Sequence, residues 1–265
     1  MPTHTPPDEM GMGKTIEVLS LLLARRDMQL GRFPDTRFSP DKTCVARERR
    51  RPRPLPAHHD ATLVVCPVTV VSQWADEVLQ FSVPGALKVL CHYGSDRVAH
   101  ADDLAPYHVV VTSFETLVSE ALTLGIRPNK TATGDADQLP YVKGHVTRRT
   151  KAHAQPVLFG VHWGRVVLDE AHAIKNHATE VAQATFCLSA THRWCLTGTP
   201  IQNSLQDLYS LFKFLQHQPW AESGWWKRVI ADPYEHGDPA ALPRLKVRSS
   251  FPSLSGFVCW LALFA

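Results

Sequence analysis

Short runs of consecutive apolar residues, separated by stretches with helical spacing, constrain the fold of this chain most. The apolar runs cover residues 61–66, 86–91, 108–112, 163–168 and 192–196. A strand without polar alternation is apolar on both of its faces, so both faces must be covered, as they are in a parallel sheet between layers of helices. The pattern therefore predicts an α/β fold with a mainly parallel sheet flanked by helices.

Helical spacing recurs before and between these runs. Apolar residues three and four positions apart predict helices over 14–28, 70–81, 114–123, 180–188 and 205–215. Strands that alternate with helices at this spacing favour an α/β fold with a parallel sheet.

Two polar segments interrupt the alternation. Residues 31–60 are rich in proline and arginine, and residues 125–156 carry many basic and few apolar side chains. We expect both to be insertions at the surface, either solvated linkers or contacts to a phosphate backbone. The folded domain is expected over 8–242, followed by an irregular tail over 243–265.

Charge and cysteine content leave the function open. A formal net charge of +3 does not by itself indicate a nucleic-acid-binding protein. The six cysteines show no CxxC spacing, so we expect reduced thiols in a cytosolic or nuclear protein rather than a zinc site. The apolar tail over 257–265 is shorter than the roughly 20 residues of a membrane span, so no membrane association is expected.

The first motif with chemical content is DEMGMGKT, which runs directly into the first predicted helix. Backbone N–H groups in a glycine-rich turn at a helix start can bind phosphate oxygens. The strict pattern has glycine where this chain has Asp8, and an ordinary glycine-rich helix start is the alternative interpretation. The residues expected to bind the nucleotide are Gly11, Met12, Gly13, Lys14 and Thr15, with Lys14 on the β- and γ-phosphates and the Thr15 hydroxyl on Mg²⁺.

The second motif places two acids, Asp169 and Glu170, directly after the apolar run 163–168. Open α/β sheets bind their ligands at the carboxyl ends of the strands. We expect Asp169 to bind Mg²⁺ and Glu170 to polarise the attacking water, as phosphoryl transfer requires. A surface acidic turn would explain this motif alone, but not both motifs in this order.

Together the two motifs resemble those of superfamily 2 helicase-type ATPases, and further segments are similar to the Swi/Snf-type translocases. LTGTPIQN over 196–203 resembles the third motif of that family. VVCP over 64–67 with Trp74, and VVTSFET over 110–116, resemble two more. The insertions and the Trp225-Trp226-Lys227 segment are most similar to the subfamily of the helicase-like transcription factor and the yeast post-replication-repair translocases.

The resemblance implies a RecA-like P-loop lobe that binds ATP and Mg²⁺, with Lys14, Asp169 and Glu170 as catalytic residues. It also implies that His172, Thr197, Gly198 and Thr199 couple the nucleotide state to contact with double-stranded DNA or chromatin. The family's second RecA-like lobe, which carries an arginine finger, is missing from this chain. Hydrolysis is therefore expected of a full-length parent, a nuclear DNA translocase acting in chromatin remodelling or DNA repair.

Alternatives remain at this stage. A truncated fragment that binds nucleotide or DNA without turnover also fits the missing lobe, whereas the TGTP segment argues against an RNA helicase. Trp74 is expected to be a packing residue rather than a DNA contact, and Ser72 and Gln73 are candidate phosphate contacts. For His172 the simpler interpretation is a polar side chain satisfied by its neighbours.

Overall fold

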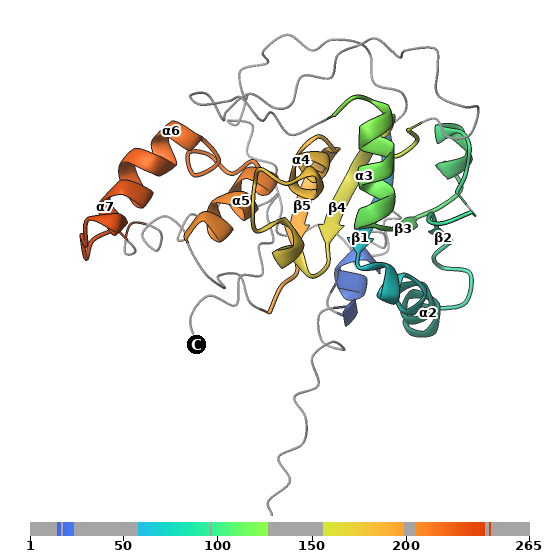
Figure 1. The fold of residues 1–265 in the computed structure, drawn as a ribbon. Coiled ribbons are helices and arrows are strands. Elements are labelled where there is room, and N and C mark those ends of the chain that lie inside the picture. Colours follow the sequence, from blue (N-terminus) through green and yellow to red (C-terminus); the bar gives the residue numbers. More distant parts are fainter. Residues whose placement is uncertain are drawn as a thin grey trace, which may run out of the picture.

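The structure, a computed structural model, describes residues 15–16, 18–23, 58–95, 97–126, 156–198, 205–241 and 244. These residues form a five-stranded sheet in the order β2-β3-β1-β4-β5, and every pair of neighbouring strands is parallel (Figure 1). The predicted parallel sheet is thus confirmed. The strands are β1 (His58–Cys66), β2 (Val89–Cys91), β3 (Val109–Ser113), β4 (His162–Leu168) and β5 (Ser189–Cys195).

Helices connect the strands and continue beyond them. They are α2 (Val71–Phe81), α3 (Phe114–Thr123), α4 (Glu180–Phe186), α5 (Leu205–Leu215), α6 (Ser223–Trp226) and α7 (Asp232–Glu235), with a π-helical turn at Lys227–Ala231. Short 3₁₀ turns occupy Val68–Val70, Ala101–Leu104 and Ala171–Ile174. In the described part of the chain, no helix has both the length and the apolar character needed to cross a lipid bilayer.

The central strands bury alternate residues in two separate cores. In β1, Leu63 and Val65 belong to one core, and Val64 and Cys66 to the other. The first core is covered by α3, α4 and α5, and the second by α2 and the helical residues 15–23. The apolar run in the sequence exists because both faces of β1 are buried.

Hydroxyl side chains begin two of the helices. Ser113 precedes α3 and accepts a hydrogen bond from the Thr116 N–H, and Thr179 precedes α4 and accepts one from the Ala182 N–H. Each satisfies a backbone donor that has no partner within the helix, which sets the first residue of the helix.

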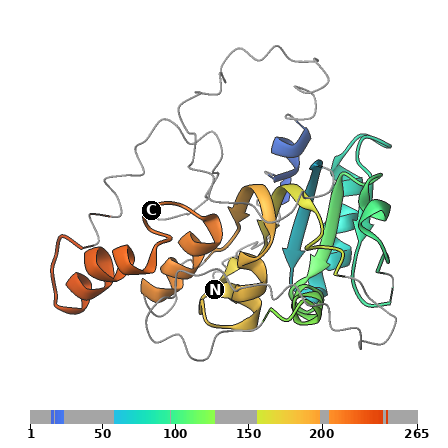
Figure 2. The same ribbon diagram turned by 90° about the horizontal axis from the view of Figure 1, so that it is seen from above.

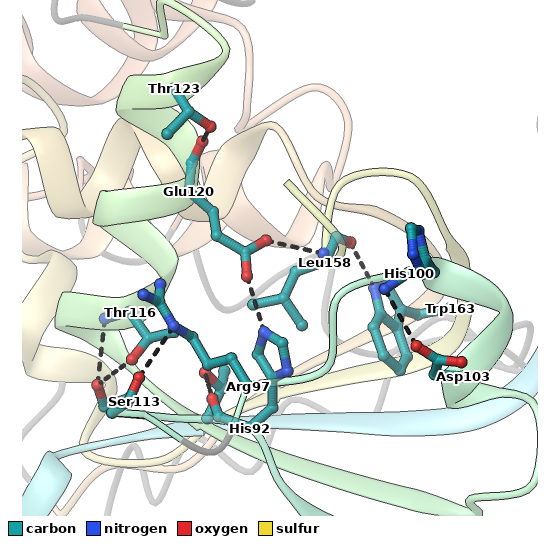
Figure 3. Close-up of polar contacts among 12 residues, drawn as sticks. His92, Arg97, His100, Asp103, Ser113, Thr116, Glu120, Thr123, Leu158 and Trp163 are labelled. Atoms are coloured by element: carbon teal, nitrogen blue, oxygen red, sulfur yellow. Dashed lines mark hydrogen bonds and ion pairs between the residues drawn. The ribbon is translucent and has the colours of Figure 1, made fainter. Parts of the chain in front are cut away.

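A buried polar network ties α3 to the segment before β4 (Figure 3). The Glu120 carboxylate lies 2.8 Å from His92 Nε2 and accepts a hydrogen bond of 2.9 Å from the Leu158 N–H. The Leu158 carbonyl in turn accepts from Trp163 Nε1 at 3.0 Å. Residues 127–155 fall outside the described residues. The network therefore attaches the first residues described after this gap to α3 and to β4.

Helices α5 and α6 lie at the end of the fold remote from β2 (Figures 1 and 2), and an aromatic cluster joins them. Tyr209, Trp220 and Trp226 are buried there, and Phe212 packs against both tryptophans. The indole of Trp220 also stacks on His217, with ring centroids 4.9 Å apart. These contacts attach α6 and the π-helical turn to α5.

Three expected boundaries differ from the structure. β1 begins at His58, inside the expected insertion 31–60, because its polar first residues pair with β4 before a bulge. β5 begins at Ser189 rather than 192, since His162 of β4 bonds the hydroxyls of Ser189 and Thr191. β2 covers only Val89–Cys91, after a turn in which Gly85 has a φ of 78°.

Other expectations fall on residues outside the description. These are the end of the first helix beyond residue 23, most of the insertions, the tail over 243–265 except Arg244, and the glycine-rich turn before Thr15. The domain range 8–242 therefore remains a prediction. The four described cysteines, Cys66, Cys91, Cys187 and Cys195, are free thiols, as expected.

Candidate functional site

The acidic turn after β4 is held between the carboxyl ends of β1 and β5, the two strands that flank β4. The Asp169 N–H donates to the Val65 carbonyl of β1 at 2.8 Å, and the Ala171 N–H donates to the Leu196 carbonyl after β5 at 2.9 Å. Leu196 N–H donates in turn to the Leu168 carbonyl. These backbone bonds fix the two acids at the carboxyl edge of the sheet, where open α/β folds bind ligands.

Both carboxylate oxygens of Asp169 accept hydrogen bonds. Oδ1 accepts from the Glu170 N–H at 2.9 Å, and Oδ2 accepts from the indole Nε1 of Trp74 at 2.8 Å. Trp74 is 3% exposed and packs in the core beneath α2, which confirms its expected packing role. Its bond to Asp169 was not anticipated, because no spacing in the sequence connects residues 95 positions apart.

Glu170 occupies a left-handed backbone conformation, with φ 49° and ψ 52°. This conformation is uncommon for a residue other than glycine and costs about 1 kcal/mol. It turns the chain sharply from β4 into the 3₁₀ turn Ala171–Ile174. The Glu170 side chain is consequently 40% exposed, beside the fixed carboxylate of Asp169.

His172 lies next to Glu170. Its Nδ1 is 3.1 Å from Glu170 Oε2, and both side chains are 40% exposed. This proximity does not form a hydrogen bond at Nδ1, so the simpler interpretation of a locally satisfied side chain stays a prediction. The same exposure leaves the imidazole accessible from outside, so its expected coupling role stays a prediction.

Cys66, the last residue of β1, lies near the acidic turn. Burial raises the pKa of its thiol far above the ordinary value, and the charge of Asp169 raises it further. The thiol donates to the Thr112 carbonyl at 3.6 Å. Because the thiolate is the nucleophile, this cysteine supplies apolar packing under the site rather than reactivity.

Two threonines predicted for the site are buried at the same edge. Thr15 begins the helical residues that pack against Cys66, Trp74 and Leu196 of the second core. Thr197 follows Leu196, whose backbone bonds both sides of the acidic turn. The structure thus gathers Thr15, Asp169, Glu170, His172, Thr197 and Gly198 at this edge, whereas Gly11, Met12, Gly13, Lys14 and Thr199 lie outside the described residues.

The oxygen donors at this edge fit Mg²⁺. A carboxylate from Asp169 and a hydroxyl from Thr15 are hard ligands, and Mg²⁺ at phosphate sites takes one or two protein oxygens together with phosphates and water. Within the described ranges, no three His, Cys, Asp or Glu side chains are grouped as a metal site made by protein ligands alone. The donor set suits a metal that arrives with a nucleotide.

Comparison with known sequences yields one family and many relatives. A family model described as "SNF2-related domain" matches residues 7–250. DNA repair protein RAD5B of Arabidopsis thaliana is 36% identical over 242 residues, which are 90% of this chain and 17% of that protein. DNA repair protein rad5 of Aspergillus fumigatus is 36% identical over 87% of this chain and 17% of its own length.

A third relative, also from Arabidopsis thaliana, is named as a putative SWI/SNF-related matrix-associated actin-dependent regulator of chromatin, subfamily A member 3-like 1. It is 29% identical over 93% of this chain and 27% of its own length. This chain therefore spans less than a third of each of these relatives.

Solved structures share the fold. The Sulfolobus solfataricus SWI2/SNF2 ATPase core in complex with dsDNA aligns with a TM-score of 0.57 and 23% identity, over 91% of this chain and 37% of that one. The Sulfolobus solfataricus SWI2/SNF2 ATPase core domain aligns with a TM-score of 0.52 and 24% identity, over 91% and 36%. The expected RecA-like architecture is thereby confirmed.

Proposed function

Because this chain belongs to the SNF2-related domain family, we propose that it is the ATP-binding first lobe, over 8–242, of a DNA-dependent ATPase that translocates on double-stranded DNA. The observation that carries the proposal is the acidic turn. Asp169 is held by two N–H donors at the carboxyl edge of the sheet, and one of them, Trp74, belongs to the same core as the helical residues Val18, Leu19 and Leu22.

In this proposal the glycine-rich turn and Lys14 hold the triphosphate of ATP. Backbone N–H groups of Gly11, Met12 and Gly13 bind phosphate oxygens, and the ammonium of Lys14 offsets the charge of the β- and γ-phosphates. Thr15 and Asp169 hold the Mg²⁺ ion, which, when bound, neutralises charge on the phosphates.

Glu170 acts on the water molecule that attacks the γ-phosphate. Its carboxylate is exposed beside Asp169, so it can accept a hydrogen bond from that water and orient it. The His172 imidazole lies beside this carboxylate, with Nδ1 3.1 Å from Glu170 Oε2. His172, Thr197, Gly198 and Thr199 then carry the state of the nucleotide to the DNA-contacting surface.

Turnover is proposed for a two-lobed protein rather than for this chain alone. The chain spans 17% of the Rad5-type relatives and 37% of the DNA-bound ATPase core. An arginine finger supplied by a second lobe is worth about 10³–10⁵ in rate in other NTPases. We therefore expect this chain to bind Mg·ATP and to hydrolyse it very slowly.

Double-stranded DNA or chromatin is the proposed partner, and the nucleus the proposed location. The relatives are named as DNA repair proteins and a chromatin regulator, and one structural neighbour was solved with dsDNA. Contacts in this class go mainly to phosphates, so binding should weaken as salt rises and depend little on base sequence.

Binding of a fluorescent ATP analogue tests the nucleotide site. Lys14→Ala should weaken binding in the presence of Mg²⁺ at least about tenfold, since a charge-assisted contact is worth about 1.5–3 kcal/mol. Lys88→Ala, at an exposed lysine before β2, is the matched control and should bind as the wild type does. Equal affinities for all three chains would contradict the proposed site.

Fluorescence anisotropy of labelled duplexes tests the partner. The expected result is binding of duplex DNA in which the logarithm of the association constant falls linearly with the logarithm of salt concentration, at similar strength for unrelated sequences. A chain that binds Mg·ATP but prefers double-stranded RNA would overturn the assignment of DNA as the partner.

A further inference from the structure

The indole of Trp74 connects helix α2 to the acidic turn after β4. Its Nε1 donates to Asp169 Oδ2 at 2.8 Å. The indole N–H can only donate, and an ionised carboxylate can only accept, so this is a charge-assisted bond with a single polarity. It is also a bond from one secondary-structure element to another, whereas the second donor to Asp169, the Glu170 N–H, belongs to the turn itself.

We infer that Trp74 is a positioning residue for Mg·ATP: it fixes the Asp169 carboxylate in the orientation that receives the Mg²⁺ of the nucleotide. This inference rests on the proposed function. The two N–H donors approach different oxygens of one carboxylate, so together they fix both its position and the plane of its three heavy atoms. Loss of the Trp74 bond would remove the donor that holds Oδ2 from a different secondary-structure element.

The packing around Trp74 makes it a rigid donor. Trp74 belongs to a buried cluster that also contains Val64 and Cys66 of β1, Val111 of β3, and Val71 and Val78 of its own helix. Side chains in such a core occupy single rotamers, so the N–H direction is set before any ligand arrives. Preorganised groups of this kind spare the ordering cost at the moment of binding.

A purely structural tryptophan would behave differently, and Trp194 of β5 provides the comparison. Trp194 is 4% exposed and belongs to the same core as Trp74. Phenylalanine at either position removes part of a buried indole and leaves a cavity, so both variants should lose stability. Only Trp74→Phe removes a donor to Asp169.

The test compares ATP dissociation constants with Mg²⁺ and with EDTA, for the wild type, Trp74→Phe and Trp194→Phe. The dissociation constant in EDTA divided by the dissociation constant in Mg²⁺ measures how much magnesium strengthens ATP binding. Trp74→Phe should lower this ratio about tenfold, because its dissociation constant in Mg²⁺ rises while the value in EDTA stays unchanged. Trp194→Phe should keep the wild-type ratio, and urea unfolding of both variants should show a loss of stability in each.

An unchanged ratio in Trp74→Phe, or an equal fall in Trp194→Phe, would overturn the inference. A wild-type chain that binds ATP no better with Mg²⁺ than with EDTA would instead overturn the magnesium site of the proposed function, and the inference with it. The two failures are therefore distinguishable.

A second measurement keeps the inference testable if Trp74→Phe does not fold. In ¹H–¹⁵N spectra of the wild type, the indole N–H resonance that Asp169→Asn moves reports the Trp74 bond. Mg·ATP should shift this resonance, and ATP in EDTA should leave it in place. If Mg·ATP binds without moving it, Trp74 does not act on the site.

Discussion

Replacing Glu120 by alanine should lower the free energy of unfolding by about 2–6 kcal/mol, because it leaves two buried polar groups without their partner at about 1–3 kcal/mol each. The carboxylate is buried and contacts two buried groups: His92 Nε2 lies at 2.8 Å, and the Leu158 N–H donates to it at 2.9 Å. Alanine leaves both without this acceptor, and each unsatisfied group costs about 1–3 kcal/mol. The loss is large relative to the stability of a typical domain.

Urea unfolding followed by circular dichroism measures the effect. Glu120→Gln keeps the volume and one acceptor oxygen, so it should cost only about 1–2 kcal/mol and stay measurable if the alanine variant is unfolded. Glu115→Ala, at an exposed position on the same helix, should change the free energy by less than about 0.5 kcal/mol. Ordinary surface substitutions change the free energy of unfolding by less than about 0.5 kcal/mol. A Glu120→Ala variant whose free energy of unfolding differs from that of the wild type by no more than this would refute the account of the network.

Three further predictions concern other residues. Burial raises the pKa of the Cys187 thiol to about 11 and that of Cys66 higher still, so iodoacetamide at pH 8 should label both slowly, and Cys187 should speed up as the pH approaches 11; mass spectrometry of the labelled peptides checks this. Glu170→Gly should raise the free energy of unfolding by up to about 1 kcal/mol in urea titrations, because glycine relieves the left-handed backbone; a loss would contradict the strain. Arg193→Met removes a buried guanidinium that stacks on Phe214 and has unpartnered Nε and Nη1 atoms in the described structure, so the midpoint of thermal unfolding should not fall.

The sheet could be predicted from the sequence because its strands are apolar on both faces. Leu63 and Val64 point into different cores, and that double burial is what a continuous apolar run reports. The first residues of β1 and β5 could not be found in this way. His58 and Ser189 are polar and join the sheet through pairing with β4, which leaves no hydrophobic signal.

In the candidate site, too, some residues could be predicted from the sequence and some contacts could not. Asp169 and Glu170 could be predicted because they follow an apolar strand, where the fold places ligand-binding residues. The bond from Trp74 to Asp169 and the Glu120 network could not, because each joins residues that are distant in sequence through side-chain geometry. Glu120 also stands at a buried position of α3, where a helical pattern alone predicts an apolar residue.

The most direct test of the central claim is a crystal structure of this chain with Mg²⁺ and a non-hydrolysable ATP analogue. The account predicts the triphosphate at the carboxyl edge of the sheet, beside the helical residues that include Thr15, with the magnesium ion bound to the Asp169 carboxylate and the Trp74 N–H still donating to Oδ2. Nucleotide bound elsewhere on the fold, or at this edge with Asp169 turned away from the metal, would contradict it.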